Sequence, residues 1–203
     1  MSGEANLNRI PEFFRKKMFS SNLPQPTLLV ASPHLTDNHF KRAVILVLEH
    51  HTHGAVGMIV NKPTSIRVSH AFQSPEILWA GDPQEVIWYG GPVMRESCWM
   101  LHEPLEMFAT GGTIKLAPGL MVSSSVDSLQ ELSRNPPSRL RFIRGISGWG
   151  ASQLDKEISS GMWLTTDFNS GFLFNEGPDG MWEAAYRMMG INPSHLTFNH
   201  GIH

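Results

Sequence analysis

The sequence contains a single cysteine, Cys98, among 203 residues. One thiol cannot form an intramolecular disulfide, which excludes a disulfide-stapled scaffold and fits a reducing compartment. Long apolar runs are also missing, because the longest one, Ala43–Leu48, is far shorter than the ~20 residues that span a bilayer. Residues 1–19 scatter Arg9 and Arg15–Lys17 among short apolar pairs and never build the apolar centre of a signal peptide. We therefore expect a cytoplasmic protein that does not enter the membrane.

A basic excess is absent too, since 16 Lys and Arg face 18 Asp and Glu and the formal net charge is −2. Domains that hold nucleic-acid backbones usually carry a clear positive excess. Arg139 and Arg141 would share one strand face, with Leu140 and Phe142 on the other, which is typical of a half-buried strand with a solvated side. No helix-turn-helix, zinc-finger or RNA-binding pattern is visible. We expect no direct sequence-specific DNA binding.

The length and composition are those of one globular domain that can bury roughly 70% of its unfolded surface. We predict an N-terminal extension over residues 1–26, with a short helix at Pro11–Met18, and a single α/β domain over residues 27–203. No internal repeat or low-complexity tract interrupts it.

Strands and helices are expected to intermix along this domain. Strand-like runs occur at Thr27–Ala31, Ala43–Glu49, Val56–Val60, Val86–Tyr89, Cys98–His102, Leu120–Ser123 and Leu140–Ile146. Helices are predicted from Thr64 or Ser65 to Phe72, from a capping box at Ser124 and Asp127, over Gln153–Ser159, and over Met181–Met189 before Gly190. Residues 73–82 are expected to form a loop. A hairpin-like turn at His51–Gly54 argues against an entirely parallel sheet, so we predict a mixed sheet covered by helices.

A series of motifs runs along the chain in a single order: Leu29–Pro33, Phe40–His50, Gly54–Pro63, Gly90–Val93 with Leu101-His102, Gly145–Trp149 with Gln153-Leu154 and Glu157, and Trp163, Leu173-Phe174 and Trp182–Ile191. Together these motifs resemble the YqgE/AlgH family of bacterial proteins. Lys62 stands where the family usually has Arg, Ser152 where it has Gly, and Asp155 where it has Glu. The resemblance implies a three-layer α/β arrangement, with a mixed, curled sheet flanked by helices and a smaller α+β subdivision. For function it implies only a transcriptional-regulator label, without an established activity.

The segment from Gly145 to Gln153 is the first candidate site. A strand ends there, glycines stand at 145, 148 and 150, and a helix opens near Gln153. Glycines let a backbone approach a ligand closely, and helix N-termini favour anions. The spacing is that of neither a dinucleotide-binding nor a Walker loop. The alternative is a structural turn that buries Trp149 and uses Gln153 to satisfy backbone groups. The candidate ligand-binding residues are Gly90, Gly91, Gly145, Gly148, Trp149 and Gln153.

Nucleophilic chemistry is weakly supported. Ser147 lies near glycines, but the second glycine comes one residue too early for a nucleophile elbow. Cys98 and His102 would lie about 13 Å apart along one strand, too far for a nucleophile–base pair. His50, His51 and His53 cluster in a turn without further zinc ligands, so we predict no metal site and no cofactor.

Two functions remain open at this point. The first, which the sequence favours, is a non-enzymatic regulatory or binding protein. It would recognise a small anion or a protein partner through the Gly90–Val93 and Gly145–Gln153 loops. A C-terminal helix rich in Met and Trp could serve as core or as a docking face. The second is an enzyme acting on an anionic small molecule, with Glu49, His50 or His102 as the acid/base groups.

Overall fold

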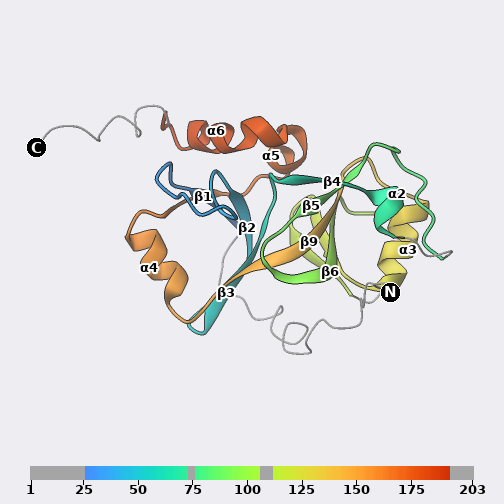
Figure 1. Ribbon diagram of the computed structural model, residues 1–203, viewed down its shortest axis with the longest axis horizontal. Coiled ribbons are helices and arrows are strands. Elements are labelled where there is room, and N and C mark those ends of the chain that lie inside the picture. Colours follow the sequence, from blue (N-terminus) through green and yellow to red (C-terminus); the bar gives the residue numbers. More distant parts are fainter. Residues whose placement is uncertain (1–25, 73–75, 106–111, 193–203) are drawn as a thin grey trace, which may run out of the picture. The chain divides into compact units, whose positions relative to one another are not determined.

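The computed structural model describes residues 26–72, 76–105 and 112–192 (Figure 1). The helix expected at Pro11–Met18 lies outside these residues. The described chain groups into two compact units: residues 63–146 form unit 1, and residues 26–62 together with 147–192 form unit 2. The single domain expected over residues 27–203 stays a prediction.

Unit 2 contains an antiparallel sheet with the strand order β10–β1–β2–β3–β9. Its strands are β1 (Thr27–Ala31), β2 (Val44–His51), β3 (Gly54–Ile59), β10 (Trp163–Asp167) and the last residues of β9 (Leu140–Trp149). The first half of β2 is apolar at every position and buried, which is the pattern of a strand covered on both faces. The predicted hairpin between β2 and β3 is confirmed.

Three helices belong to unit 2: α4 (Gln153–Ser159), α5 (Ser170–Asn175) and α6 (Pro178–Met188). Helix α6 begins at a proline, which suits a first helical turn, and is followed by a glycine with positive φ. Two side chains of α6 donate hydrogen bonds to one carbonyl of β1: the indole of Trp182 at 2.8 Å and the hydroxyl of Tyr186 at 3.1 Å. These bonds hold α6 (red in Figure 1) beside β1.

Unit 1 contains the other strands and one parallel pair. The strands are β4 (Pro63–Arg67), β5 (Val86–Tyr89), β6 (Val93–His102), β7 (Thr113–Ala117) and β8 (Leu120–Ser123). The first part of β9 pairs in parallel with β5 and antiparallel with β6, and the ladder continues through β8 to β7. The expected mixed sheet and mixed α/β fold are thus confirmed, whereas the three-layer arrangement stays a prediction.

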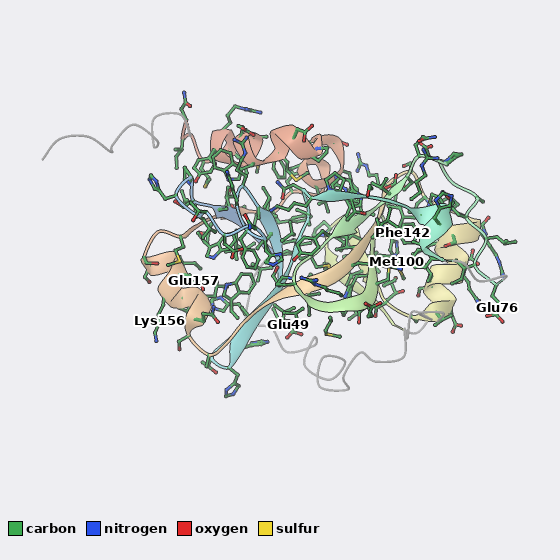
Figure 2. All side chains as sticks on the ribbon, viewed as in Figure 1. Glu49, Glu76, Met100, Phe142, Lys156 and Glu157 are labelled. Atoms are coloured by element: carbon green, nitrogen blue, oxygen red, sulfur yellow. The ribbon has the colours of Figure 1, made fainter. Side chains whose placement is uncertain are left out.

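Helices α2 (Val68–Ala71) and α3 (Val126–Arg134) cover one face of the unit 1 sheet. Met100 of β6 and Phe142 of β9 are direct cross-strand partners, and both side chains are labelled in Figure 2. They centre a core cluster whose other buried members are Val68, Phe72, Ile87, Cys98, Leu129 and Leu132.

Some sequence predictions were wrong in detail. Residues 63–67 form strand β4 instead of a helix, because the Thr64 hydroxyl bonds the carbonyl of Ile87 on β5 at 2.7 Å instead of capping a helix. The N-cap of α3 is Ser125, not Ser124, since its side chain accepts from the backbone N–H of Ser128. Strands β7 and β10 and helix α5 were not predicted.

Candidate functional site

Three of the candidate glycines lie together in unit 1, where they allow backbones to touch. Gly145 has φ +77°, and a Cβ there would lie 2.3 Å from the carbonyl oxygen of Gly91. A Cβ on Gly90 would lie 2.2 Å from the carbonyl oxygen of Gly145, and the Gly90 N–H donates to the carbonyl of Arg144 at 2.7 Å. The bend between β5 and β6 therefore packs directly on β9. The space beside these glycines is filled by backbone.

Gly148, in the unit 2 part of β9, differs from these three glycines. It is exposed, its φ is not positive, and a Cβ would meet nothing within 4 Å. The fold therefore does not require glycine at this position. The next residue, Trp149, is only 8% exposed, as the structural alternative for this segment expected.

The carboxylate of Glu157 on α4 links the end of β9 to the start of β10. Its Oε2 accepts from the indole N–H of Trp149 at 2.9 Å and from that of Trp163 at 2.8 Å. Its Oε1 accepts from the side-chain amide of Gln153 at 2.8 Å. The two indole rings pack edge to face with centroids 6.1 Å apart. We call Trp149, Glu157 and Trp163 the indole clamp, and Figure 2 labels Glu157 on α4.

Gln153 opens helix α4 in the way the structural alternative predicted. Its Oε1 accepts the backbone N–H of Gly150 at 3.0 Å, which satisfies a donor in the turn before the helix. The preceding Ser152 has φ +56°, and its side chain makes no cap bond. Asp155 in the first turn and Glu157 one turn on place negative charge beside this helix start, which opposes an anion there. Binding of an anion by this segment stays a prediction.

The acid/base candidates of unit 2 point away from one another. His50 lies opposite Ala55, which in turn lies opposite Trp149, so these side chains share the sheet face that α4 covers. The Nε2 of His50 lies 3.0 Å from Oδ1 of Asp155 on α4. Glu49, labelled on β2 in Figure 2, is the neighbouring strand residue, so its side chain points to the other face; it is 7% exposed.

His102, the third acid/base candidate, is fully buried in unit 1. Its Nδ1 lies 2.8 Å from the carbonyl oxygen of Glu103, and its Nε2 lies 2.9 Å from the hydroxyl of Ser123. Burial lowers the pKa of His102 from 6.5, more than the bond to that carbonyl and the charge of Glu103 raise it. Ser123 could not be recognised as the partner of His102 from the sequence, because the two residues meet only through the pairing of β6 with β8.

The two nucleophile candidates are buried as well. Burial raises the pKa of the Cys98 thiol to about 12, so almost no thiolate exists at neutral pH. Ser147 is 0% exposed on β9, opposite Gly57. Among the described residues, no three His, Cys, Asp or Glu side chains gather as metal ligands would. No helix in the described part of the chain is long and apolar enough to cross a membrane.

One feature near the glycine contact was missed by the sequence analysis. Strand β6 pairs with β9 at Val93 opposite Ile146 and again at Cys98 opposite Arg144, so residues 94–97 face the single residue Gly145. Val93 is 44% exposed, residues 95 and 96 are exposed, and Met94 has φ +51°. We call residues 93–97 the β6 bulge. The sequence feature that could have indicated the bulge is the apolar Val93 directly after the turn residues Gly90-Gly91-Pro92.

Known proteins resemble this chain over most of its length. A family model described as AlgH-like matches residues 28–194. A UPF0301 protein of Myxococcus xanthus is 33% identical over 178 residues, covering 87% of this chain and 97% of the relative. A UPF0301 protein of Ruegeria pomeroyi is 35% identical over 177 residues, covering 86% and 96%.

Two solved structures share the fold. The solution structure of AlgH from Pseudomonas aeruginosa has a TM-score of 0.70 and 29% identity, with 91% of this chain and 100% of that chain covered. A crystal structure of a Corynebacterium diphtheriae protein, at 20% identity and a TM-score of 0.69, shows the fold alone and covers 97% and 99%. The family model and the curated relatives agree with the motifs read from the sequence, and the chain belongs to the AlgH-like family.

Proposed function

We propose that this protein acts by binding a protein partner, not by catalysis, and that the partner contacts the Gly90–Val93 loop and the β6 bulge. The observation that carries the proposal is the bulge itself. It presents an exposed apolar side chain, Val93, beside the charged residues Arg95 and Glu96, on a segment whose regular pairing with β9 is interrupted. An apolar centre with a charged surround is the usual composition of a protein interface.

The backbone of this segment is held in place before any partner arrives. The close packing of Gly91 on Gly145 fixes its start, and the pairing of Cys98 with Arg144 fixes its end. The positive φ of Met94 costs conformational energy that the fold must supply, and such strain is concentrated at functional sites. A segment that is already ordered loses less entropy on binding than a free loop does. These features favour recognition by a preformed surface.

The acid/base candidates support binding over catalysis. His102 is buried and bonded to Ser123. His50 pairs with Asp155, whereas Glu49 faces the other side of its sheet. A catalytic acid or base must lie within hydrogen-bond reach of a substrate, and no such convergence supports the enzyme alternative.

The regulatory label of the family fits action through a protein partner. A formal charge of −2 gives no electrostatic attraction to a nucleic-acid backbone. We therefore propose that any transcriptional role is exerted through a protein partner and not by direct contact with DNA. We also propose that the protein is cytoplasmic, since its single cysteine is buried and unpaired, which suits a reducing compartment.

Site-specific photocrosslinking in living cells tests the proposal. A photoreactive amino acid replaces Arg95 in the bulge or, as the control, Leu78, which belongs to the same unit and is 65% exposed. We expect a discrete protein adduct from position 95 that is missing from position 78. The adduct should disappear when Val93→Asp is added, with an unchanged melting temperature. The same adducts from both positions, or none from position 95, would show that the bulge is not the binding surface.

A further inference from the structure

His102 is the start of a chain of hydrogen-bonded side chains inside unit 1. Its Nδ1 faces a backbone carbonyl, which can only accept, so Nδ1 carries the proton and Nε2 is the acceptor. The Ser123 hydroxyl, 2.9 Å away, must then donate to Nε2. Because Ser123 donates its only hydroxyl proton to Nε2, it must accept from the hydroxyl of Thr113, 2.6 Å away. The neutral imidazole thus sets the direction of every bond that follows.

The chain ends at the first turn of α3. Thr113 lies 3.4 Å from the hydroxyl of Ser128, which lies 2.8 Å from that of Ser125. Ser125 is the N-cap of α3 and accepts the backbone N–H of Ser128 at 3.1 Å. His102, Ser123 and Ser128 are 0% exposed, whereas Thr113 and Ser125 are partly exposed. The imidazole is therefore linked through four hydroxyl groups to the start of a helix.

We propose that His102 makes this part of unit 1 an acid-sensitive element: proton uptake by the buried imidazole loosens β8 and α3 from β6. A protonated ring has two N–H donors, so Ser123 must accept from it, and the hydroxyl proton of Ser123 must turn from Nε2 to another acceptor such as the hydroxyl oxygen of Thr113. A hydroxyl proton can turn in this way without a large movement of its side chain. The cost is the positive charge on a ring that water does not reach, and separating β8 from β6 exposes that ring to water.

The surrounding charges do not cancel this cost. Glu103 follows His102 on its own strand, but its Oε1 already accepts from the hydroxyl of Ser138 and the N–H of Arg139. On the other elements, His102 pairs with Leu140 of β9 and Met121 of β8, both uncharged. The nearest charged residues on these elements lie one step further away: Arg139 and Arg141 flank Leu140, Lys115 of β7 pairs with Met121, and Asp127 lies in the first turn of α3.

The sign of the effect follows from the lowered pKa. At neutral pH the ring is uncharged in both the closed and the open state, so the element keeps its full stability. Below about pH 6.5 His102 binds a proton in the open state, whereas in the closed state it binds one only at lower pH, because burial lowers its pKa there. In that range the equilibrium constant for opening increases by up to tenfold for each unit by which the pH falls.

Amide hydrogen exchange of the full chain, corrected for intrinsic rates, tests the proposal. Between pH 7 and 5.5 we expect the opening of β8 and α3 amides to rise by several-fold, up to a ceiling of about eightfold, and that of β1 and β2 amides in unit 2 to change less than about twofold. His102→Gln should remove the rise, and His50→Gln, which changes a histidine of unit 2, should retain it. An equal rise in wild type and His102→Gln, or no rise in wild type, would overturn the proposal.

A ring titration of the wild-type protein keeps the test decisive if His102→Gln does not fold. Histidine carbon and nitrogen chemical shifts report both the protonation state and the tautomer. We expect His102 to titrate below pH 6.5 and in step with the exchange of α3 amides. A His102 ring that titrates at or above pH 6.5, or one that gains its proton while α3 stays fully protected, would refute the acid-sensitive element.

Discussion

Replacing Glu157 by alanine removes the acceptor of the indole clamp and should destabilise the protein strongly. The indole N–H groups of Trp149 and Trp163 both lose their partner, on residues that are only 8% and 3% exposed. A buried donor left without an acceptor costs about 1–3 kcal/mol. The indole of Trp149 lies close enough to the surface to regain some hydration, so the two donors together should lower the free energy of unfolding by about 3 kcal/mol. For a chain of this size that corresponds to roughly 6–12 °C in melting temperature.

Urea unfolding followed by tryptophan fluorescence and circular dichroism measures this free energy. Glu157→Gln keeps one side-chain oxygen for the indoles but removes the charge, so about half the loss is expected. Glu131→Ala is the matched control, because Glu131 also accepts from a side-chain amide, that of Asn135, which lies exposed at the end of α3. It should cost no more than about 0.5 kcal/mol.

A double-mutant cycle identifies the cause of the loss. Trp149→Phe removes one of the two donors and keeps an aromatic ring. If unsatisfied indoles are the reason for the loss, Glu157→Ala should cost about 1–2 kcal/mol less in the Trp149→Phe background. A Glu157→Ala cost no larger than that of Glu131→Ala, or strict additivity in the cycle, would refute the clamp as a source of stability.

The remaining predictions concern small residues. Gly148→Ala should be neutral or stabilise by up to about 1 kcal/mol, whereas Gly145→Ala should destabilise markedly because its Cβ would lie 2.3 Å from the Gly91 carbonyl oxygen; thermal melts of the two variants would show equal effects if this reasoning fails. Cys98, with a pKa of about 12, should not react with iodoacetamide at pH 8 until urea unfolds the protein, and rapid labelling of the folded chain would contradict its burial.

The sequence predicted what depends on neighbouring residues. The turn at Gln153 was predicted with its mechanism, since the side chain and the Gly150 N–H that it satisfies are three positions apart. The hairpin of β2 and β3 was predicted for the same reason. Glu157 was noticed as part of a motif, but its role depends on Trp163, which reaches it only after β10 has paired with β1. Such a tertiary contact leaves no periodic signal in the chain.

The wrong or missing predictions of strands and helices have physical causes of the same kind. Thr64 has a helix-capping side chain, but its hydroxyl bonds the carbonyl of Ile87 and its segment pairs with β5 as a strand. Residues 113–117 alternate in the manner of a strand, but the run is short and follows two glycines. The partnership of His102 with Ser123 crosses 21 residues, and the β6 bulge exists only relative to the register of β9. Pairing between strands decided each of these outcomes.

The order of the chain has a consequence for synthesis on the ribosome. Strands β1, β2 and β3 are made before their outer partners: the β9 residues that pair with β3 follow only after the whole of residues 63–146, and β10, which pairs with β1, comes later still. At ~5–20 residues per second that delay lasts several seconds. During this time the outer edges of β1 and β3 lack their partners β10 and β9. The nascent chain is therefore most exposed to aggregation through these two edges, and a chaperone that holds β1–β3 would help most before β9 and β10 are made.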